Sequence, residues 1–150
     1  MKKEKLIIGR KDLVDLPDFG FVNIPAKVDT GAYSSSLHCE NIEIVNEDGT
    51  IKLTFYIPDY EGKVVKGVKF STSEFVQKFI KSSTGYKELR YVIKARIIIF
   101  GKEYQTEFSL TDRQGMKFPV LIGRKLLQKR FVVDVARTNL SYKSKISSTL

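Results

Sequence analysis

The most informative segment of this 150-residue chain is Val28-Asp29-Thr30-Gly31-Ala32, in which an acid follows an apolar run and precedes a turn. The segment by itself leaves two interpretations open. The side chain of Asp29 either caps the turn, as Asp before Thr-Gly commonly does, or stands as a carboxylate on a loop beneath a cleft, held by the amide groups that follow it.

A second informative segment is Pro119-Val120-Leu121-Ile122-Gly123-Arg124-Lys125-Leu126-Leu127. It places a wholly apolar strand directly before a glycine and a stretch rich in leucine, lysine and arginine. This order predicts a short helix over residues 123–129, followed by a returning strand at 131–135.

The rest of the chain shows an all-β pattern of short β-branched and aromatic runs separated by turn residues. The expected strands cover residues 5–8, 21–28, 41–45, 51–57, 63–70, 75–82, 86–100 and 103–111. Glu47-Asp48-Gly49, residues 83–85 and Gly101-Lys102 are expected to turn antiparallel hairpins. Residues 30–39 are small and polar. The tail at 138–150 is polar and serine-rich, and we expect it to be frayed.

Length and composition predict a single domain over residues 1–150, with its core at about 5–137. Hydrophobic residues make up 42% and charged residues 29% of the chain, a balance typical of globular proteins. No apolar run reaches the length of a membrane span, and the apolar stretch near the N-terminus is too short for a secretory signal. Cys39 is the only cysteine. We therefore expect a cytoplasmic protein with no membrane partner.

The net excess of positive charge lies in the second half of the chain. Residues 1–75 carry a net charge of −2 and residues 76–150 one of +11. Such a bias attracts nucleic acid, an acidic protein or an anionic substrate, although a solvated basic surface is the simpler explanation and the one we favour. Because the charges are interleaved with apolar residues and form no arginine-rich block, we expect no nucleic-acid partner.

The inventory of reactive side chains excludes several mechanisms. His38 is the only histidine, and its neighbour Cys39 would point the other way in an extended strand, so a Ser-His-Asp or Cys-His site is disfavoured. We expect His38 to be an ordinary surface or edge residue. One His and one Cys make a zinc site poor, and no glycine-rich phosphate loop precedes a helix. The sequence thus predicts no metal and no cofactor.

The two informative segments together resemble the retropepsin family of aspartic proteases. In that family an Asp-Thr-Gly-Ala loop is threaded by an apolar-apolar-Gly-Arg strand end that opens a helix, as in Asp29 to Ala32 and Leu121 to Arg124. The resemblance covers roughly residues 21–135. It implies a closed, retropepsin-like acid-protease β-barrel with one short helix near the C-terminus.

A closer resemblance is to a bacterial and archaeal group of retropepsin-like proteins associated with the RimK glutamate ligase and often labelled ATP-dependent zinc proteases. Four stretches carry it: residues 24–32, Ser36-Leu37-His38, Leu110-Thr111-Asp112-Arg113, and 119–124 with 131–134. The words zinc and ATP in that label find no support in the ligands and loops counted above.

The resemblance assigns roles to the residues of the loop. Asp29 is the catalytic aspartate, and because one chain supplies a single copy, the second carboxylate must come from a symmetric homodimer. Thr30 would hydrogen-bond across the dimer axis and the Gly31 amide would orient the carboxylate. Leu121, Ile122, Gly123 and Arg124 would support the loop. Ala32 supplies no hydroxyl to the carboxylate, so we expect a rate optimum above about pH 3.

The resemblance also implies a flap hairpin over the site at Ser82-Ser83-Thr84-Gly85. A plain surface hairpin is the alternative. Arg90 and Lys81, beside this hairpin, are candidate contacts for an acidic substrate. Asp112 and Arg113 are either substrate contacts or a salt bridge at a strand end, and Arg124 lacks the acidic partner that retroviral enzymes give it.

The leading hypothesis is a homodimeric aspartic endopeptidase that hydrolyses peptide bonds, with acidic or glutamylated protein segments as one candidate substrate class. The rival hypothesis is a non-catalytic retropepsin-fold binding domain that partners a RimK-type ligase. A zinc peptidase is the third.

Overall fold

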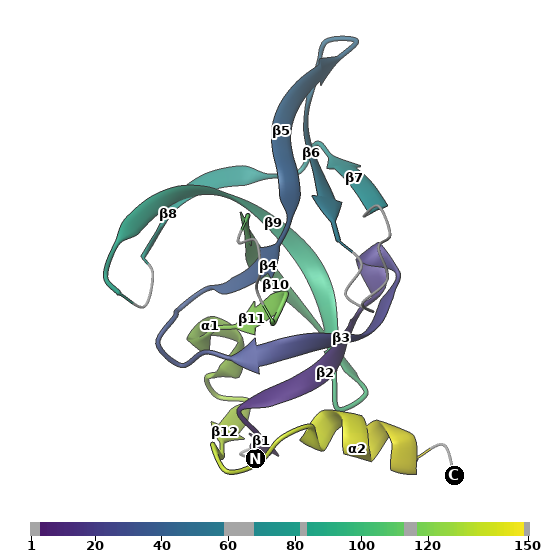
Figure 1. The fold of residues 1–150 in the computed structure, drawn as a ribbon, viewed down its shortest axis with the longest axis vertical. Helices are drawn as coiled ribbons and strands as arrows, with labels where there is room; N and C mark the ends of the chain where they lie inside the picture. The colour runs from purple at the N-terminus through teal and green to yellow at the C-terminus, as the bar shows by residue number, and fades with distance from the viewer. Residues whose placement is uncertain (1–3, 59–67, 82–83, 113–116, 149–150) are drawn as a thin grey trace.

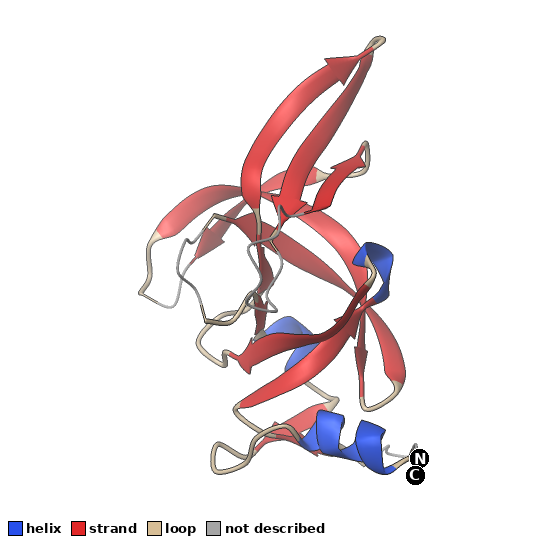
Figure 2. Cartoon of the chain, turned by 45° about the vertical axis from the view of Figure 1, so that its right-hand side comes forward, coloured by secondary structure: helices blue, strands red, loops and turns tan. Residues whose placement is uncertain are grey.

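The protein is described from a computed structural model, which covers residues 4–58, 68–81, 84–112 and 117–148. Strands dominate it (Figure 2). They are β1 (Leu6–Ile8), β2 (Lys11–Leu16), β3 (Phe21–Val28), β4 (Ser35–His38), β5 (Glu40–Glu47), β6 (Thr50–Ile57), β7 (Val68–Thr72), β8 (Val76–Lys81), β9 (Lys87–Ile99), β10 (Lys102–Thr111), β11 (Val120–Ile122) and β12 (Phe131–Val133). The helical elements are the 3-10 turn η1 (Pro17–Phe19), α1 (Arg124–Leu127) and α2 (Leu140–Ser147).

Among the described residues, six strands close into a ring. The hydrogen-bonded order is β10-β4-β11-β3-β2-β9, and β9 also pairs with β10, while β8 adds to β9 from outside (Figure 1). The pairs β3–β11 and β4–β10 are parallel. This mostly β architecture with a short helix directly after β11 confirms the predicted fold class. The ring also sets Val28 beside Ile122, so the ends of the two informative segments meet.

Two smaller sheets flank the ring. Strands β5, β6 and β7 form an antiparallel sheet that projects from one end of the molecule, and β1 pairs in parallel with β12 near the other end (Figure 1). Strand β7 begins at Val68, so residues 63–67 of the expected strand at 63–70 lie outside the described residues.

Aliphatic and aromatic side chains fill the core. In β2 the alternation of a half-buried strand places Asp12, Val14 and Leu16 on the buried side. Each buried large apolar side chain contributes about 1.5–3 kcal/mol relative to an exposed one. The largest fully buried side chains are Phe55, Phe108, Ile8, Leu16, Leu37, Leu53, Ile57, Ile97, Ile99, Ile122, Leu126 and Val14.

Two hairpins end in turns whose central residues both have positive φ. Asp48 and Gly49 have φ values of 51° and 85°, which confirms the expected turn between β5 and β6. The turn between β9 and β10 lies one residue earlier than predicted. Its central residues are Phe100 and Gly101, with φ values of 53° and 71°, and Lys102 already pairs with Ile99.

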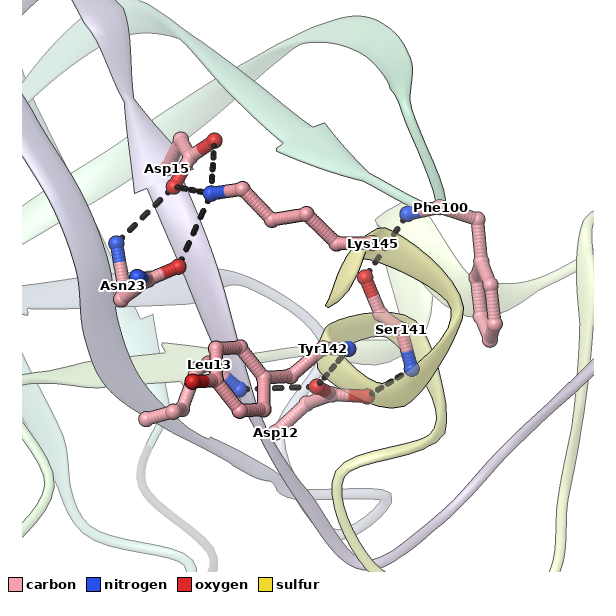
Figure 3. A network of polar contacts seen from close by, with 8 residues as sticks. All are labelled: Asp12, Leu13, Asp15, Asn23, Phe100, Ser141, Tyr142 and Lys145. Carbon is pink, nitrogen blue, oxygen red and sulfur yellow. Dashed lines mark hydrogen bonds and ion pairs between the residues drawn. The ribbon is translucent and has the colours of Figure 1, made fainter. Parts of the chain in front are cut away.

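The described part of the C-terminal tail, residues 138–148, is not frayed, contrary to the sequence-based expectation, because α2 docks against β2. The buried carboxylate of Asp12 accepts hydrogen bonds from the amides of Ser141 and Tyr142 at 2.9 and 3.1 Å. The amine of Lys145 contacts both carboxylate oxygens of Asp15 at 3.0 Å (Figure 3).

In the part of the chain that the structure describes, no helix is both long and apolar enough to span a bilayer.

Candidate active site

The Asp29 loop begins where β3 ends. The amide of Asp29 donates to the carbonyl of Ile122 at 2.9 Å, which extends the β3–β11 pairing by one residue. The Gly31 amide donates to Asp29 Oδ1 at 3.0 Å, and the Ala32 amide donates to the Asp29 carbonyl at 3.3 Å. The carboxylate therefore caps its own turn, as the first interpretation has it, and the same contact orients it; its role as the catalytic aspartate stays a prediction.

Gly123 lets β11 pass against the far side of the loop. A Cβ atom built on Gly123 would lie 2.5 Å from the Ser34 carbonyl oxygen and 2.7 Å from that of Tyr33. Its amide donates to Ser35 Oγ at 3.1 Å. Since its φ of −90° suits any residue, glycine is required here by space and not by backbone conformation.

Arg124 closes the loop from the start of α1. Its amide donates to the Ala32 carbonyl at 2.8 Å and its Nη1 donates to the Thr30 carbonyl at 2.9 Å. The guanidinium also lies 5.8 Å from the centre of the Tyr33 ring, within cation–π range. The structure thus gives this arginine a carbonyl and an aromatic ring as partners, which sequence reasoning did not identify.

The loop presents its residues in a graded way. Asp29 is half-buried, Thr30 and Gly31 are exposed, and Leu121 and Ile122 are buried beneath them. No salt bridge joins Asp29 to a residue that the structure describes. One supported carboxylate per chain is therefore available at an exposed loop.

The predicted flap is a hairpin of β8 and β9. Its last described pair is Lys81 with Lys87, and Thr84 and Gly85 are exposed at the tip, with Gly85 at a φ of 88°. Ser82 and Ser83 lie outside the described residues. The hairpin is present, and its role as a substrate lid stays a prediction.

Arg90 points from β9 toward the inside of the ring. Its Nη2 lies 2.9 Å from Glu88 Oε2, and its Nη1 donates to Ser109 Oγ at 3.5 Å. Ser109 Oγ in turn donates to the Ser35 carbonyl at 3.4 Å. The guanidinium is buried, while the Glu88 side chain is 60% exposed. Arg90 is thus tied to the residue that supports Gly123.

Of the remaining predicted pair, Asp112 is exposed directly after β10, and Arg113 lies outside the described residues. The role expected of Asp112 and Arg113, either as substrate contacts or as a salt bridge at a strand end, stays a prediction.

This geometry can be compared with known proteins. The family described as RimB-like, "Retropepsin-like aspartic endopeptidase RimB", matches residues 7–144. The chain belongs to this family. The match spans the Asp29 loop and ends within α2, at residue 144.

Relatives of this RimB-like chain include much longer proteins. It is 31% identical over 132 residues to a probable alpha-L-glutamate ligase of Desulfotalea psychrophila, and 31% identical over 134 residues to one of Shewanella pealeana. These matches cover 88% and 89% of this chain but 28% and 29% of the relatives, so the chain spans less than a third of their length.

A crystal structure also resembles this RimB-like chain. The Legionella pneumophila protein Lpg0085, of unknown function (DUF785), matches with a TM-score of 0.70 and 29% sequence identity. The match covers 92% of this chain and 99% of that one, which supports the fold described above.

His38 and Cys39 of this RimB-like chain are both buried, so the expectation of a surface histidine was wrong. His38 is 5% exposed in β4, which has strand neighbours on both sides, and its Nε2 lies 4.0 Å from Glu40 Oε1. Burial, with a smaller contribution from the Asp112 charge, raises the pKa of the Cys39 thiol. A buried thiol kept protonated is a poor nucleophile.

Ser35 and Ser109 are the supporting residues that sequence reasoning missed. Both are buried, at 2% and 1% exposure, and both act through hydroxyl groups between strands. A serine-rich stretch after Asp-Thr-Gly-Ala carried the only signal, and it suggested a loop. In the described residues, no three His, Cys, Asp or Glu side chains lie close enough together to hold a metal ion.

Proposed function

We propose that this chain is an aspartic endopeptidase whose site is completed by a second copy of itself. The observation that carries the proposal is the Asp29 carboxylate, oriented by the Gly31 amide at 3.0 Å on a loop where Thr30 and Gly31 are exposed. Membership of the RimB-like family supports this chemistry. A two-fold axis at the loop would bring one Asp29 against its own copy.

The proposed reaction needs two carboxyl groups that share one proton. One Asp29 carboxylate takes a proton from water as the water oxygen bonds to the peptide carbonyl carbon, and the other carboxyl group donates its proton to the carbonyl oxygen. The C–N bond then breaks, and a proton passes to the leaving amine.

Acidic or glutamylated protein segments are the proposed substrate class. Two observations support it, namely the net charge of +11 in residues 76–150 and the relatives named probable alpha-L-glutamate ligase. A fluorogenic peptide rich in glutamate is expected to be cut faster than its glutamine counterpart. Equal rates would contradict the proposed substrate class but not the proposed peptidase activity.

A mixing experiment tests the shared site. Asp29→Asn is expected to abolish cleavage, and in an equal, fully exchanged mixture with the unmodified chain only about one quarter of dimers carry two aspartates. Activity should therefore fall to about one quarter and not to one half, the value for independent monomers. Elemental analysis and a chelator control test the zinc alternative.

A non-catalytic binding domain is the second candidate, favoured by the fact that the matched relatives are ligase-named proteins more than three times as long as the match. In that case Asp29→Asn would leave binding to a RimK-type ligase intact, and no peptide would be cut by either form. Retained binding together with lost cleavage would favour the peptidase.

A further inference from the structure

A cavity of about 540 Å³ lies away from the Asp29 loop. It is bordered by η1, by β6 and β7 of the three-stranded sheet, by the segment that joins β7 to β8, and by the middle of β9. No residue of 29–34 or 119–124 lines it. Its volume falls within the range of protein ligand pockets, which is about 300–1,000 Å³.

Phenylalanine rings make the apolar part of this cavity. The rings of Phe19, Phe55 and Phe70 form a cluster with centroid distances of 5.0, 5.9 and 6.2 Å, and Phe75 adds a fourth ring at the start of β8. Aromatic rings in edge-on contact fix the shape of the floor. The floor therefore suits one bulky apolar side chain.

Two of the carboxylates on the rim are already neutralised. Asp18 accepts from the amide of Arg96 and from its guanidinium, each at 2.7 Å. Glu107 contacts the amine of Lys78 at 2.8 Å and that of Lys125 at 3.6 Å. Neither carboxylate has an unmatched charge to offer a ligand.

Lys94 is an unmatched cation on the wall of the aromatic cavity. It faces Glu107 across the β9–β10 pair, it lines the aromatic cavity, and it forms no ion pair with a residue that the structure describes. A second hollow of about 260 Å³ shares Lys94 and Glu107 with the first and adds Lys125 and Arg130. Because they share these two residues, the two hollows adjoin, and we call the pair the groove; one end is apolar and the other cationic.

The third rim carboxylate makes the two ends of the groove differ in charge. Glu74 lines only the aromatic cavity and forms no ion pair with a described residue, whereas Arg130 lines only the second hollow. An acidic group is therefore repelled from the aromatic end and attracted toward Lys94, Lys125 and Arg130.

We propose that this groove is a second binding site, for an acidic polypeptide segment whose bulky apolar side chain enters the phenylalanine cavity and whose neighbouring carboxylates lie along Lys94, Lys125 and Arg130. The inference rests on charge complementarity and cavity shape, and it holds whether or not Asp29 cleaves peptides. Such a site would hold a partner protein at a distance from the candidate active site.

A binding measurement tests the proposal on the full chain carrying Asp29→Asn, so that the probe stays intact. The probe is a fluorescein-labelled peptide with one phenylalanine followed by three glutamates, measured by fluorescence anisotropy. Lys94→Glu is expected to weaken binding about tenfold or more. Lys102→Glu, an exposed lysine of the same β9–β10 hairpin that lines neither hollow, is the matched control and should change affinity less than about twofold.

Two further variants separate the ends of the groove. Ser73→Trp, at an exposed rim position, should block the aromatic cavity and weaken the phenylalanine peptide but not one with alanine in its place. A glutamine version of the probe should lose the dependence on Lys94. Equal losses from Lys94→Glu and Lys102→Glu, or tighter Lys94-dependent binding of a single-stranded oligonucleotide than of the peptide, would overturn the proposal.

Discussion

The amide of Gly123 donates a hydrogen bond to Ser35 Oγ at 3.1 Å, which joins the end of β11 to the start of β4 behind the Asp29 loop. The Ser35 carbonyl accepts from Ser109 Oγ on β10 at 3.4 Å. Because β4 lies between β10 and β11, Ser35 connects three neighbouring strands of the ring. The position of the loop thus depends on a buried serine that lies behind it.

Replacing this serine tests that dependence. Ser35→Ala leaves the Gly123 amide without its acceptor, and a buried donor left unpaired costs about 1–3 kcal/mol of the free energy of unfolding, measured by chemical denaturation. Ser36→Ala, at a buried serine of the same strand, is the matched control and should cost less. Equal costs for the two variants would show that the Gly123 contact contributes nothing specific.

Arg124 gives a prediction in which activity and stability separate. Arg124→Ala removes the contact with the Thr30 carbonyl and the cation–π contact with Tyr33, both at exposed positions. The free energy of unfolding should therefore change by less than about 1 kcal/mol. Peptide cleavage should fall about tenfold or more, since small misplacements of a reacting group are costly.

Arg124→Lys keeps the charge but loses the planar fork of donors, and we expect an intermediate rate of cleavage. Lys143→Ala, on the exposed face of α2, is the control for a lost positive charge. A rate for Arg124→Ala equal to that of Lys143→Ala would show that the arginine does not position the loop.

Strands with continuous local signals were predictable from the sequence. Residues 21–28 were predicted with the bounds that β3 has, and the apolar run before Gly123 identified β11. The pairing of these two strands is nonlocal, and the resemblance to retropepsins supplied it. Local patterns therefore sufficed wherever apolar side chains alone determine the strand.

Other elements could not be predicted, because their polar residues are satisfied by distant partners. Strand β2 carries Asp12 on its buried side, where an acid is unexpected in the sequence. The amides of Ser141 and Tyr142, which are distant in the sequence, donate to its carboxylate. Strand β4 consists of Ser35–His38, all four buried, and the Ser35 hydroxyl accepts from the Gly123 amide at the end of β11. The helix α2 lacks a strong apolar face and depends on the same remote carboxylate.

Two glycines are required for different reasons, and alanine distinguishes them. Gly123→Ala forces a methyl group to within 2.5 Å of the Ser34 carbonyl oxygen, and we expect a loss of about 3 kcal/mol or more, since backbone cannot yield cheaply. Gly101→Ala meets open space but keeps a φ of 71°, which costs about 1–2 kcal/mol. Thermal unfolding measures both, and the reverse order of costs would contradict the close approach of β11 to the loop.

The buried carboxylate of Asp12 should control the docking of the C-terminal helix. Asp12→Ala leaves the first amides of α2 without an acceptor, and we expect a loss of about 3 kcal/mol together with fast hydrogen exchange throughout 140–147. Asp15→Asn removes the charge that pairs with Lys145 but keeps an oxygen that can accept from the Asn23 amide, and it should cost about 1 kcal/mol or less. Slow exchange in α2 of the Asp12→Ala chain would show that packing alone holds the helix.

Glu107 predicts how stability depends on pH. The hydrogen bond from Lys78 on β8 lowers the pKa of the Glu107 carboxyl, and the charge of Lys125 on α1 adds to this effect, against the opposing effect of partial burial. A carboxylate whose folded-state pKa is lowered contributes stability that is fully present above its unfolded pKa of about 4.3 and is lost as pH falls through the folded value. Glu107→Gln should therefore reduce the free energy of unfolding at neutral pH, and the difference from the unmodified chain should shrink to nothing in acid. Glu74→Gln, at an exposed carboxylate with no ion pair to a described residue, is the control. A difference between the Glu107→Gln and unmodified chains that stays constant from neutral pH into the acid range would show that lost packing, and not the two lysines, accounts for it.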